Sequence, residues 1–139
     1  MCIRDSRGEI DNTIIAFTSD HGEMNGDHGL IYKMNFLDGS VRVPLIIKAP
    51  GFEEGLTNNS LVENSDLGPT LLQLVGRDIG YNQFAKSLVD AMDGSNHRED
   101  GLSEIVGEFM LMNDEWKIAL NRDGLTCVFE IVVLEIISS

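Results

Sequence analysis

The sequence predicts an α/β fold, because two strand-like runs precede a segment with helical periodicity. Residues 14–17 (IIAF) form a continuous apolar run, and a second run at residues 41–47 is followed by the turn signal Pro50-Gly51. Continuous runs of this kind are typical of strands covered on both faces. We therefore expect strands at residues 13–19 and 42–48, in a largely parallel sheet with a helix packed on it.

The predicted helix has its own start and stop signals. Ser65 or Asp66 can cap its N-terminus, and Gly76 can end it in the left-handed conformation that glycine tolerates. Its apolar side chains recur at helical spacing and predict one buried face: Leu67, Leu71, Leu74 and Val75. Residues 85–94 predict a short second helix.

The C-terminal part predicts a small antiparallel sheet. Two strand-like segments, residues 103–111 and 114–124, are joined by the turn signal Asn113-Asp114. Residues 127–137 are apolar and β-prone, which makes them an aggregation hazard when unpaired. We therefore expect the chain to be poorly soluble, and removal of the residues after Leu125 to raise the soluble yield.

Composition and turn-forming residues suggest how the chain is divided into domains. Residues 1–10 show no apolar period and predict a disordered or artefactual lead, and the polar stretch at residues 94–101 is the best internal boundary. We therefore expect the main α/β domain at residues 11–95 and an incomplete antiparallel subdomain at residues 96–139.

Charge and apolar content restrict the classes of partner. The net charge of −13 argues against nucleic acid, whose phosphates would be repelled. No run reaches the ~18 apolar residues that a membrane helix needs, so no membrane partner is expected. The only two cysteines, Cys2 and Cys127, form neither a disulfide framework nor a zinc motif.

The loop after the first strand concentrates side chains that can bind a metal ion. The stretch TSDHGEMNGDHGL holds Asp20, His21, Glu23, Asp27 and His28. Asp20 and His21 come directly after the strand, where ligands of open α/β sheets bind, and together they can share one divalent cation. The spacing fails an EF-hand, and two histidines are too few for a structural zinc site. A solvated acidic loop is the alternative reading of these residues alone.

The wider stretch from Thr13 to Gly51 resembles the sulfatase family of the alkaline-phosphatase superfamily. The resemblance lies in Ser19-Asp20-His21-Gly22, in Lys33 one loop later, and in the Val41-Arg42-Val43-Pro44 strand that runs to Pro50-Gly51. The segment SLVENSDLGPTLLQLVG also resembles the family's helix, and the stretch LIYKMNFLDGSVRVPL is similar to choline-sulfatase-type members. The resemblance implies the C-terminal part of an alkaline-phosphatase-like α/β sandwich with a small antiparallel C-terminal sheet.

The resemblance also implies a reaction. Members hydrolyse sulfate esters with a formylglycine nucleophile and a calcium ion, so Asp20 and His21 would be Ca²⁺ ligands and Lys33 would contact the sulfate of a small-molecule or carbohydrate ester. His28 would lie at the edge of the substrate or behind the ligands. Glu23 and Asp27 would form a hydrated acidic face.

The absence of a nucleophile motif from these residues leaves several hypotheses about activity. The 139 residues contain no C-x-P-S-R motif from which formylglycine could form, so we expect a sulfatase fragment that needs the N-terminal half of the same enzyme and is inactive alone. Two alternatives stay open: a phosphate or phosphonate ester hydrolase of the same superfamily, and a non-catalytic calcium-binding module.

Overall fold

The computed structural model describes residues 3–78 and 80–131, which form two compact units. The first unit comprises Met1–Asp20, Val43–Asn58 and Asn64–Asn96, and the second comprises His21–Arg42, Asn59–Glu63 and His97–Ser139. Among the described residues, none of the helices has both the length and the apolar character required to cross a bilayer. The expected domain borders at residues 10 and 95 stay predictions.

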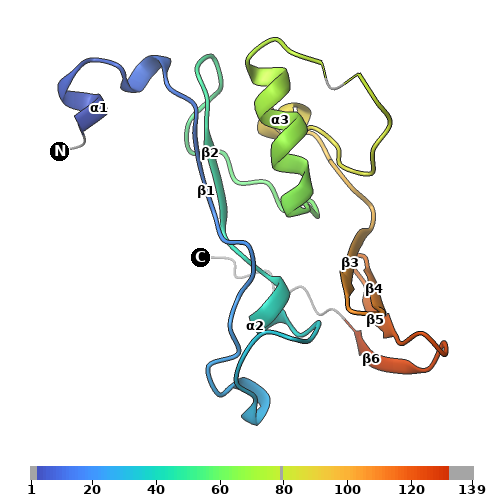
Figure 1. The fold of residues 1–139 in the computed structure, drawn as a ribbon. Helices are drawn as coiled ribbons and strands as arrows, with labels where there is room; N and C mark the ends of the chain where they lie inside the picture. Colours follow the sequence, from blue (N-terminus) through green and yellow to red (C-terminus); the bar gives the residue numbers. More distant parts are fainter. Residues whose placement is uncertain (1–2, 79, 132–139) are drawn as a thin grey trace. The chain divides into compact units, whose positions relative to one another are not determined.

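The first unit begins with short helical turns and a two-stranded sheet. Helix α1 (Ile3–Ser6) and the 3₁₀ turn η1 (Ile10–Asn12) precede β1 (Ile15–Thr18), which pairs with β2 (Leu45–Lys48) (Figure 1). Both strands lie inside the predicted ranges. They run antiparallel, however, with Phe17 opposite Ile46, so the expectation of parallel strands is wrong for this pair. An apolar run does not encode strand direction, and only antiparallel partners can do without a crossover helix.

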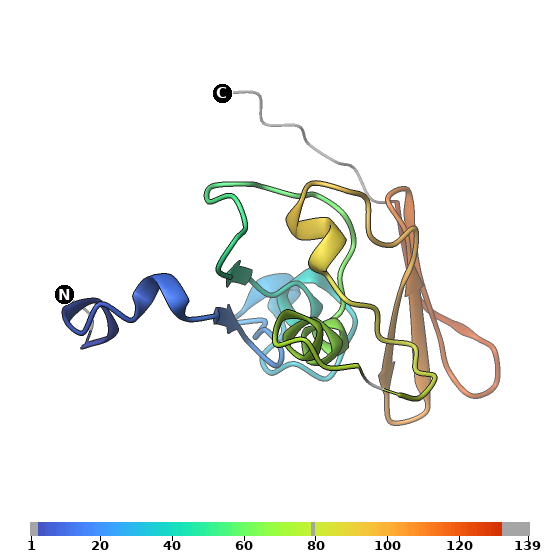
Figure 2. The ribbon, with the colours of Figure 1, turned by 90° about the horizontal axis from the view of Figure 1, so that it is seen from above.

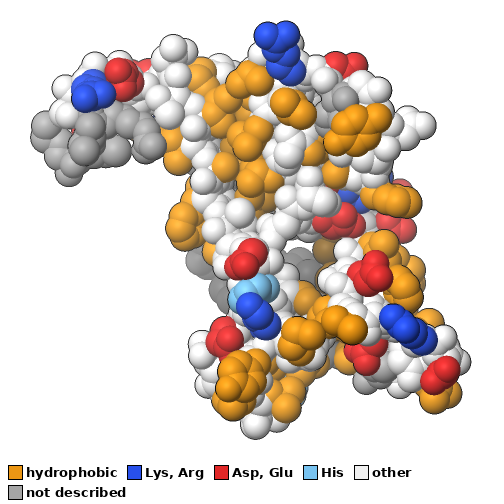
Figure 3. Space-filling model, viewed as in Figure 1, with side chains coloured by type: hydrophobic (Ala, Val, Ile, Leu, Met, Phe, Trp, Pro, Cys, Tyr) orange, Lys and Arg blue, Asp and Glu red, His pale blue; other side chains and the backbone are white. Residues whose placement is uncertain are grey.

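The β1–β2 sheet is not covered on both faces within the described residues. Phe17 and Ile46 are 59% and 64% exposed, although they face each other across the two strands. Hydrophobic side chains gather over β1, β2 and the neighbouring helix of this unit (Figure 3). A two-stranded sheet with an exposed apolar face is marginally stable alone, so this sheet lacks the cover that its sequence predicts.

Helix α3 (Leu67–Leu74) follows the 3₁₀ turn η3 (Asn64–Asp66) and confirms the predicted helix. It ends as predicted: Gly76 takes a positive φ of 70°, its N–H donates to Gln73 O, and the Arg77 N–H donates to Leu72 O at 2.8 Å. This paired arrangement satisfies carbonyls at the end of the helix.

The buried side of α3 differs from the predicted apolar face. Pro69 and Thr70 are buried, whereas Val75 is exposed. The buried Asp66 carboxylate accepts the Lys86 N–H at 2.7 Å instead of capping the helix, and the Thr70 hydroxyl accepts the Leu88 N–H. The predicted second helix is the short α4 (Val89–Met92), which contacts α3.

The second unit contains the predicted antiparallel sheet, with four strands in the order β3-β4-β5-β6 (Figures 1 and 2). The strands are β3 (Gly101–Ile105), β4 (Glu108–Met112), β5 (Trp116–Leu120) and β6 (Thr126–Ile131). The turn at Asn113-Asp114 joins β4 to β5 as predicted, and residues 103–111 form a hairpin of their own around Val106-Gly107.

The described part of the tail is paired, so the condition for the expected aggregation hazard is not met there. Strand β6 pairs with β5 from Thr126 to Ile131, so cutting the chain after Leu125 would remove a paired strand. Removal of this paired strand is therefore not expected to raise the soluble yield. The rest of the predicted tail, residues 132–137, lies outside the described residues.

The core of the second unit forms where helix α2 (Asp38–Val41) and the sheet meet. Phe36, Met110 and Ala119 are fully or almost fully buried, and Val41, Ile105, Met112 and Val128 pack against them. The segment at residues 36–41 and the sheet are therefore one packed body, on which the loop at residues 21–35 is built.

Candidate functional site

The end of β1 is held by an asparagine from a distant part of the chain. Asn64, in η3, donates its amide to Ser19 O at 2.8 Å and to Asp20 O at 3.2 Å, and its Oδ1 accepts the Thr18 hydroxyl. Sequence reasoning missed Asn64, whose only signal was a polar residue just before a predicted helix. Asp20 is exposed two residues beyond the strand, with Ser19 Oγ 3.5 Å from Asp20 Oδ1.

His21 and Lys33 are brought together within the second unit. The Lys33 ammonium contacts His21 Nε2, and His21 Nδ1 lies 2.7 Å from Gly22 O. A carbonyl oxygen only accepts, so Nδ1 carries the proton and Nε2 of the neutral ring has a lone pair. The neighbouring carbonyl therefore selects the tautomer that leaves Nε2 available to a cation.

Asp20 and His21 fall on either side of the division between the two units. Asp20 ends a segment of the first unit and His21 opens a segment of the second, and one peptide bond joins them. The convergence of Asp20, His21 and Lys33 on one solvent-open cavity stays a prediction.

Gly22 is required by a close approach of backbone. Its N–H donates to Ser40 O at 2.8 Å, and a Cβ at this position would lie 2.0 Å from Gly39 O. Met24, two residues after Gly22, is buried, and a Cβ at Gly39 would lie 3.0 Å from its sulfur, so loop and helix α2 fit closely together.

Replacing Gly22 with alanine is expected to destabilise the chain by at least the ~1–3 kcal/mol typical of overpacking. The clash is with backbone, which cannot move aside as a flexible side chain could. Urea denaturation of the full chain measures the change. Gly68→Ala in α3 is the matched control: nothing lies within 4 Å of its Cβ position, so its stability should stay equal or rise. Equal stability of Gly22→Ala and wild type would contradict the observed approach.

His28 lies on a tight turn of the same loop. It belongs to the 3₁₀ turn η2 (Asp27–Gly29), has a left-handed φ of 52°, and donates its backbone N–H to Asp27 Oδ1. Histidine tolerates this conformation better than most residues. The His28 side chain is exposed, and so are Glu23 and Asp27.

The donor set fits part of a calcium shell. A carboxylate at Asp20 and a neutral imidazole nitrogen at His21 are both groups that ligate divalent cations. Ca²⁺ takes six to eight ligands, and the part of the chain that the structure describes holds no cluster of three or more His, Cys, Asp or Glu residues suited to a metal. Asp20 and His21 would therefore supply only some of the ligands.

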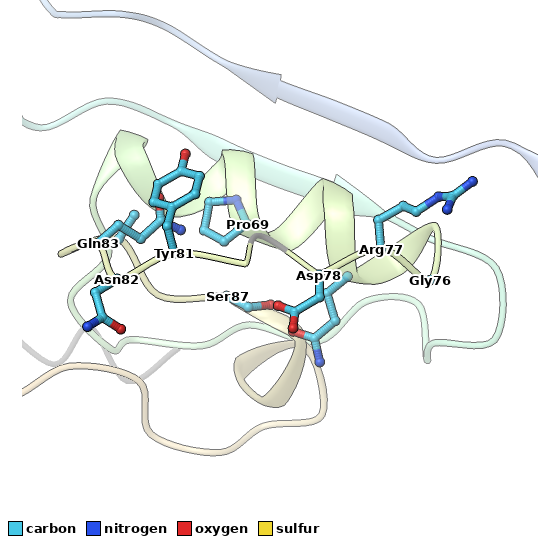
Figure 4. A pocket seen from close by; sticks show the side chains of 10 residues that line it. Pro69, Gly76, Arg77, Asp78, Tyr81, Asn82, Gln83 and Ser87 are labelled. Atoms are coloured by element: carbon cyan, nitrogen blue, oxygen red, sulfur yellow. The ribbon is translucent and has the colours of Figure 1, made fainter.

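A separate groove of about 650 Å³ lies in the first unit beside α3 (Figure 4). Pro69 and Gln73 of the helix line one side, and Arg77, Asp78, Tyr81 and Ser87 from the following segment also line it. The described residues that line this groove include none of the predicted site residues. It is therefore a feature separate from the acidic loop.

Comparison with known proteins identifies the family. The family model "Sulfatase" matches residues 5–77, which is more than half of the chain. The choline-sulfatase of Rhizobium meliloti (strain 1021) is 41% identical over 102 residues, which is 71% of this chain and 20% of that protein.

Solved structures agree on the fold. A phosphonate monoester hydrolase from Silicibacter pomeroyi matches 95% of this chain and 31% of its own, with a TM-score of 0.82 and 27% identity. A protein solved with its substrate D-glucosamine-2-N,6-O-disulfate matches 91% of this chain and 28% of its own, with a TM-score of 0.78 and 25% identity.

These matches confirm the predicted α/β class, because the chain aligns along almost its whole length with alkaline-phosphatase-like enzymes. The chain spans about a fifth of the choline-sulfatase and under a third of each solved structure. On the family match and the sequence identity together, the chain belongs to the sulfatase family.

Proposed function

We propose that the chain is the C-terminal part of a sulfuric-ester hydrolase and carries part of its active site. The observation that supports this most is the contact between His21 and Lys33. Gly22 O accepts the Nδ1–H of the imidazole, and the Nε2 lone pair faces the Lys33 ammonium group. A metal ligand and an anion-binding cation side by side are what hydrolysis of a sulfate ester needs.

The proposal includes an N-terminal segment that this chain does not contain. The relatives are three to five times longer than the matched region, and the apolar pair Phe17–Ile46 is exposed on a sheet of only two strands. We expect the N-terminal segment to supply the formylglycine nucleophile, further carboxylates, and the cover for this sheet.

Asp20 and His21 would hold a calcium ion, which when bound acts as a Lewis acid on sulfate oxygens. Asp20 contributes negative charge and His21 contributes the lone pair of Nε2. Because the lone pair of Nε2 can serve only one partner, Lys33 would have to leave His21 for a cation to be held there. The freed ammonium would then neutralise charge on the sulfate oxygens, while exposed His28 would line the edge of the substrate site.

The substrate class follows from the relatives only in outline. Choline-sulfatase and the protein solved with a disulfated glucosamine both act on sulfated compounds, so we propose a small-molecule or carbohydrate sulfate ester. A phosphonate or phosphate ester is the second candidate, because a phosphonate monoester hydrolase matches 95% of this chain. A calcium-binding module without catalysis is the third.

Rates of the full-length enzyme on a matched set of substrates test the proposal. An aryl sulfate, an aryl phosphonate monoester and an aryl phosphate with the same leaving group are compared by kcat/KM in the presence of Ca²⁺. We expect the sulfate to be preferred, and the 139-residue chain alone to be inactive. A preference for the phosphonate would establish the second candidate, and no turnover of any ester would favour the third.

A further inference from the structure

Strand β5 carries a lysine that sequence reasoning did not single out. Lys117 is 1% exposed and its Nζ lies 2.5 Å from Asp38 Oδ1. Lysine is almost never fully buried unless it is paired, and a buried ammonium holds its partner firmly because leaving it unpaired is costly. The pair therefore ties β5 to the first residue of helix α2.

Helix α2 is in turn in backbone contact with the loop at residues 21–35. Asp38 is followed by Gly39 and Ser40, whose carbonyl groups form the surface on which Gly22 lies. The Gly22 N–H donates to Ser40 O at 2.8 Å, and no side chain fits between Gly22 and Gly39 O. A shift of α2 would therefore move Gly22.

Gly22 controls the neighbouring imidazole. Its carbonyl oxygen accepts the His21 Nδ1–H at 2.7 Å, which fixes both the tautomer and the direction of Nε2. Lys117, Asp38, Gly22 and His21 all belong to the second unit, so this series of contacts lies within one compact body.

We propose that Lys117 is a positioning residue for His21, acting through Asp38, helix α2 and the Gly22 carbonyl. The proposal rests on the proposed function only in giving His21 a role as ligand. In this proposal, the Lys117–Asp38 ion pair keeps Gly22 O in the position where it accepts the His21 Nδ1–H. Loss of the pair is expected to release the imidazole from this tautomer while the four-stranded sheet persists.

The test reads the tautomer of His21 directly, by long-range ¹H–¹⁵N correlation spectra of the full chain at a pH where imidazoles are neutral. The chain has three histidines, and the variant His21→Gln assigns the His21 signals. In wild type we expect the Nδ1-protonated form to predominate. In Lys117→Met and in Asp38→Asn we expect that predominance to be lost, with the signals of His28 and His97 unchanged.

Two further variants control for charge and geometry. Lys86→Met removes one exposed lysine from the first unit and should leave the His21 signals unchanged. Asp38→Glu keeps a carboxylate for Lys117 and should retain the Nδ1-protonated form. Asp38 is 60% exposed, so water can solvate its carboxylate in Lys117→Met, which is the variant expected to fold even where Asp38→Asn, with its buried Lys117 ammonium, does not.

An unchanged tautomer in folded Lys117→Met would overturn the proposal, and so would the same loss in Lys86→Met. Unfolding of both Lys117→Met and Asp38→Asn would also overturn it, because the pair would then hold the whole unit and not His21 in particular. The readout needs neither metal nor turnover. A failure here would therefore leave the proposed sulfatase chemistry standing, and failure of that chemistry would leave this result standing.

Discussion

Replacing Lys33 with alanine in the full-length enzyme is expected to lower turnover of an aryl sulfate by about 10²–10³-fold. In the proposed site the Lys33 ammonium would face charge that grows as the ester bond breaks, and losing one such contact typically costs a factor of this size. Its contact with His21 places Lys33 beside a proposed metal ligand, where the sulfate would bind. Steady-state kinetics on an aryl sulfate measure the loss, which should fall mainly on kcat.

Two variants sharpen this prediction. Lys33→Arg should restore only part of the rate, because a planar guanidinium does not replace a compact ammonium. Lys86→Ala removes an exposed lysine far along the chain and should leave kcat unchanged. Full activity of Lys33→Ala would remove Lys33 from the proposed site.

Replacing Phe36 with alanine is expected to destabilise the chain by about 3–5 kcal/mol, the usual cost of deleting a buried aromatic side chain. Phe36 is 1% exposed and packs with Met110 and Ala119 between the segment that leads into α2 and the sheet. Since typical domains are stable by only ~5–15 kcal/mol, this loss would leave little of the fold. Thermal and urea denaturation of the full chain measure it.

Phe84→Ala is the matched control, because Phe84 is 90% exposed. Its free energy of unfolding should stay within ~0.5 kcal/mol of wild type, as for most surface substitutions. A loss at Phe36 no larger than at Phe84 would show that the core of the second unit is not where the structure places it.

Local signals in the sequence predicted the elements that depend on local physics. The two apolar runs became β1 and β2, and α3 ends in the left-handed Gly76 that its sequence indicated. The need for glycine at residue 22, by contrast, arises from the backbone of Gly39, seventeen positions away.

Features that depend on distant partners were not predictable from one sequence. The antiparallel direction of β1 and β2 and the pairing of β6 with β5 are set by which strands meet, and an apolar run does not specify its partner. The turn at Val106-Gly107 was missed because Val106, a β-branched residue, adopts a positive φ of 26° that its type disfavours.

The candidate site divides in the same way. The residue types of Asp20 and His21 predicted a metal site, and the family resemblance added Lys33 as a contact to the sulfate. The structure brings His21 and Lys33 into contact, and the site itself stays a prediction. Asn64, which holds the end of β1, and Lys117, the proposed positioning residue, come from later segments of the chain, and nothing in the loop itself indicates them.

The calcium affinity of the full-length enzyme, compared between wild type and Asp20→Asn, tests most directly whether the acidic loop is a metal site. Calorimetric titration of metal-free protein gives Kd without any need for turnover. Substitution of residues that only support a ligand typically costs 10–100-fold in affinity, so loss of the Asp20 carboxylate should raise Kd at least about tenfold. Asp27→Asn, an exposed aspartate of the same loop, should leave Kd unchanged. Equal Kd values for wild type and Asp20→Asn, or a larger loss at Asp27, would contradict the assignment of Asp20 as a calcium ligand.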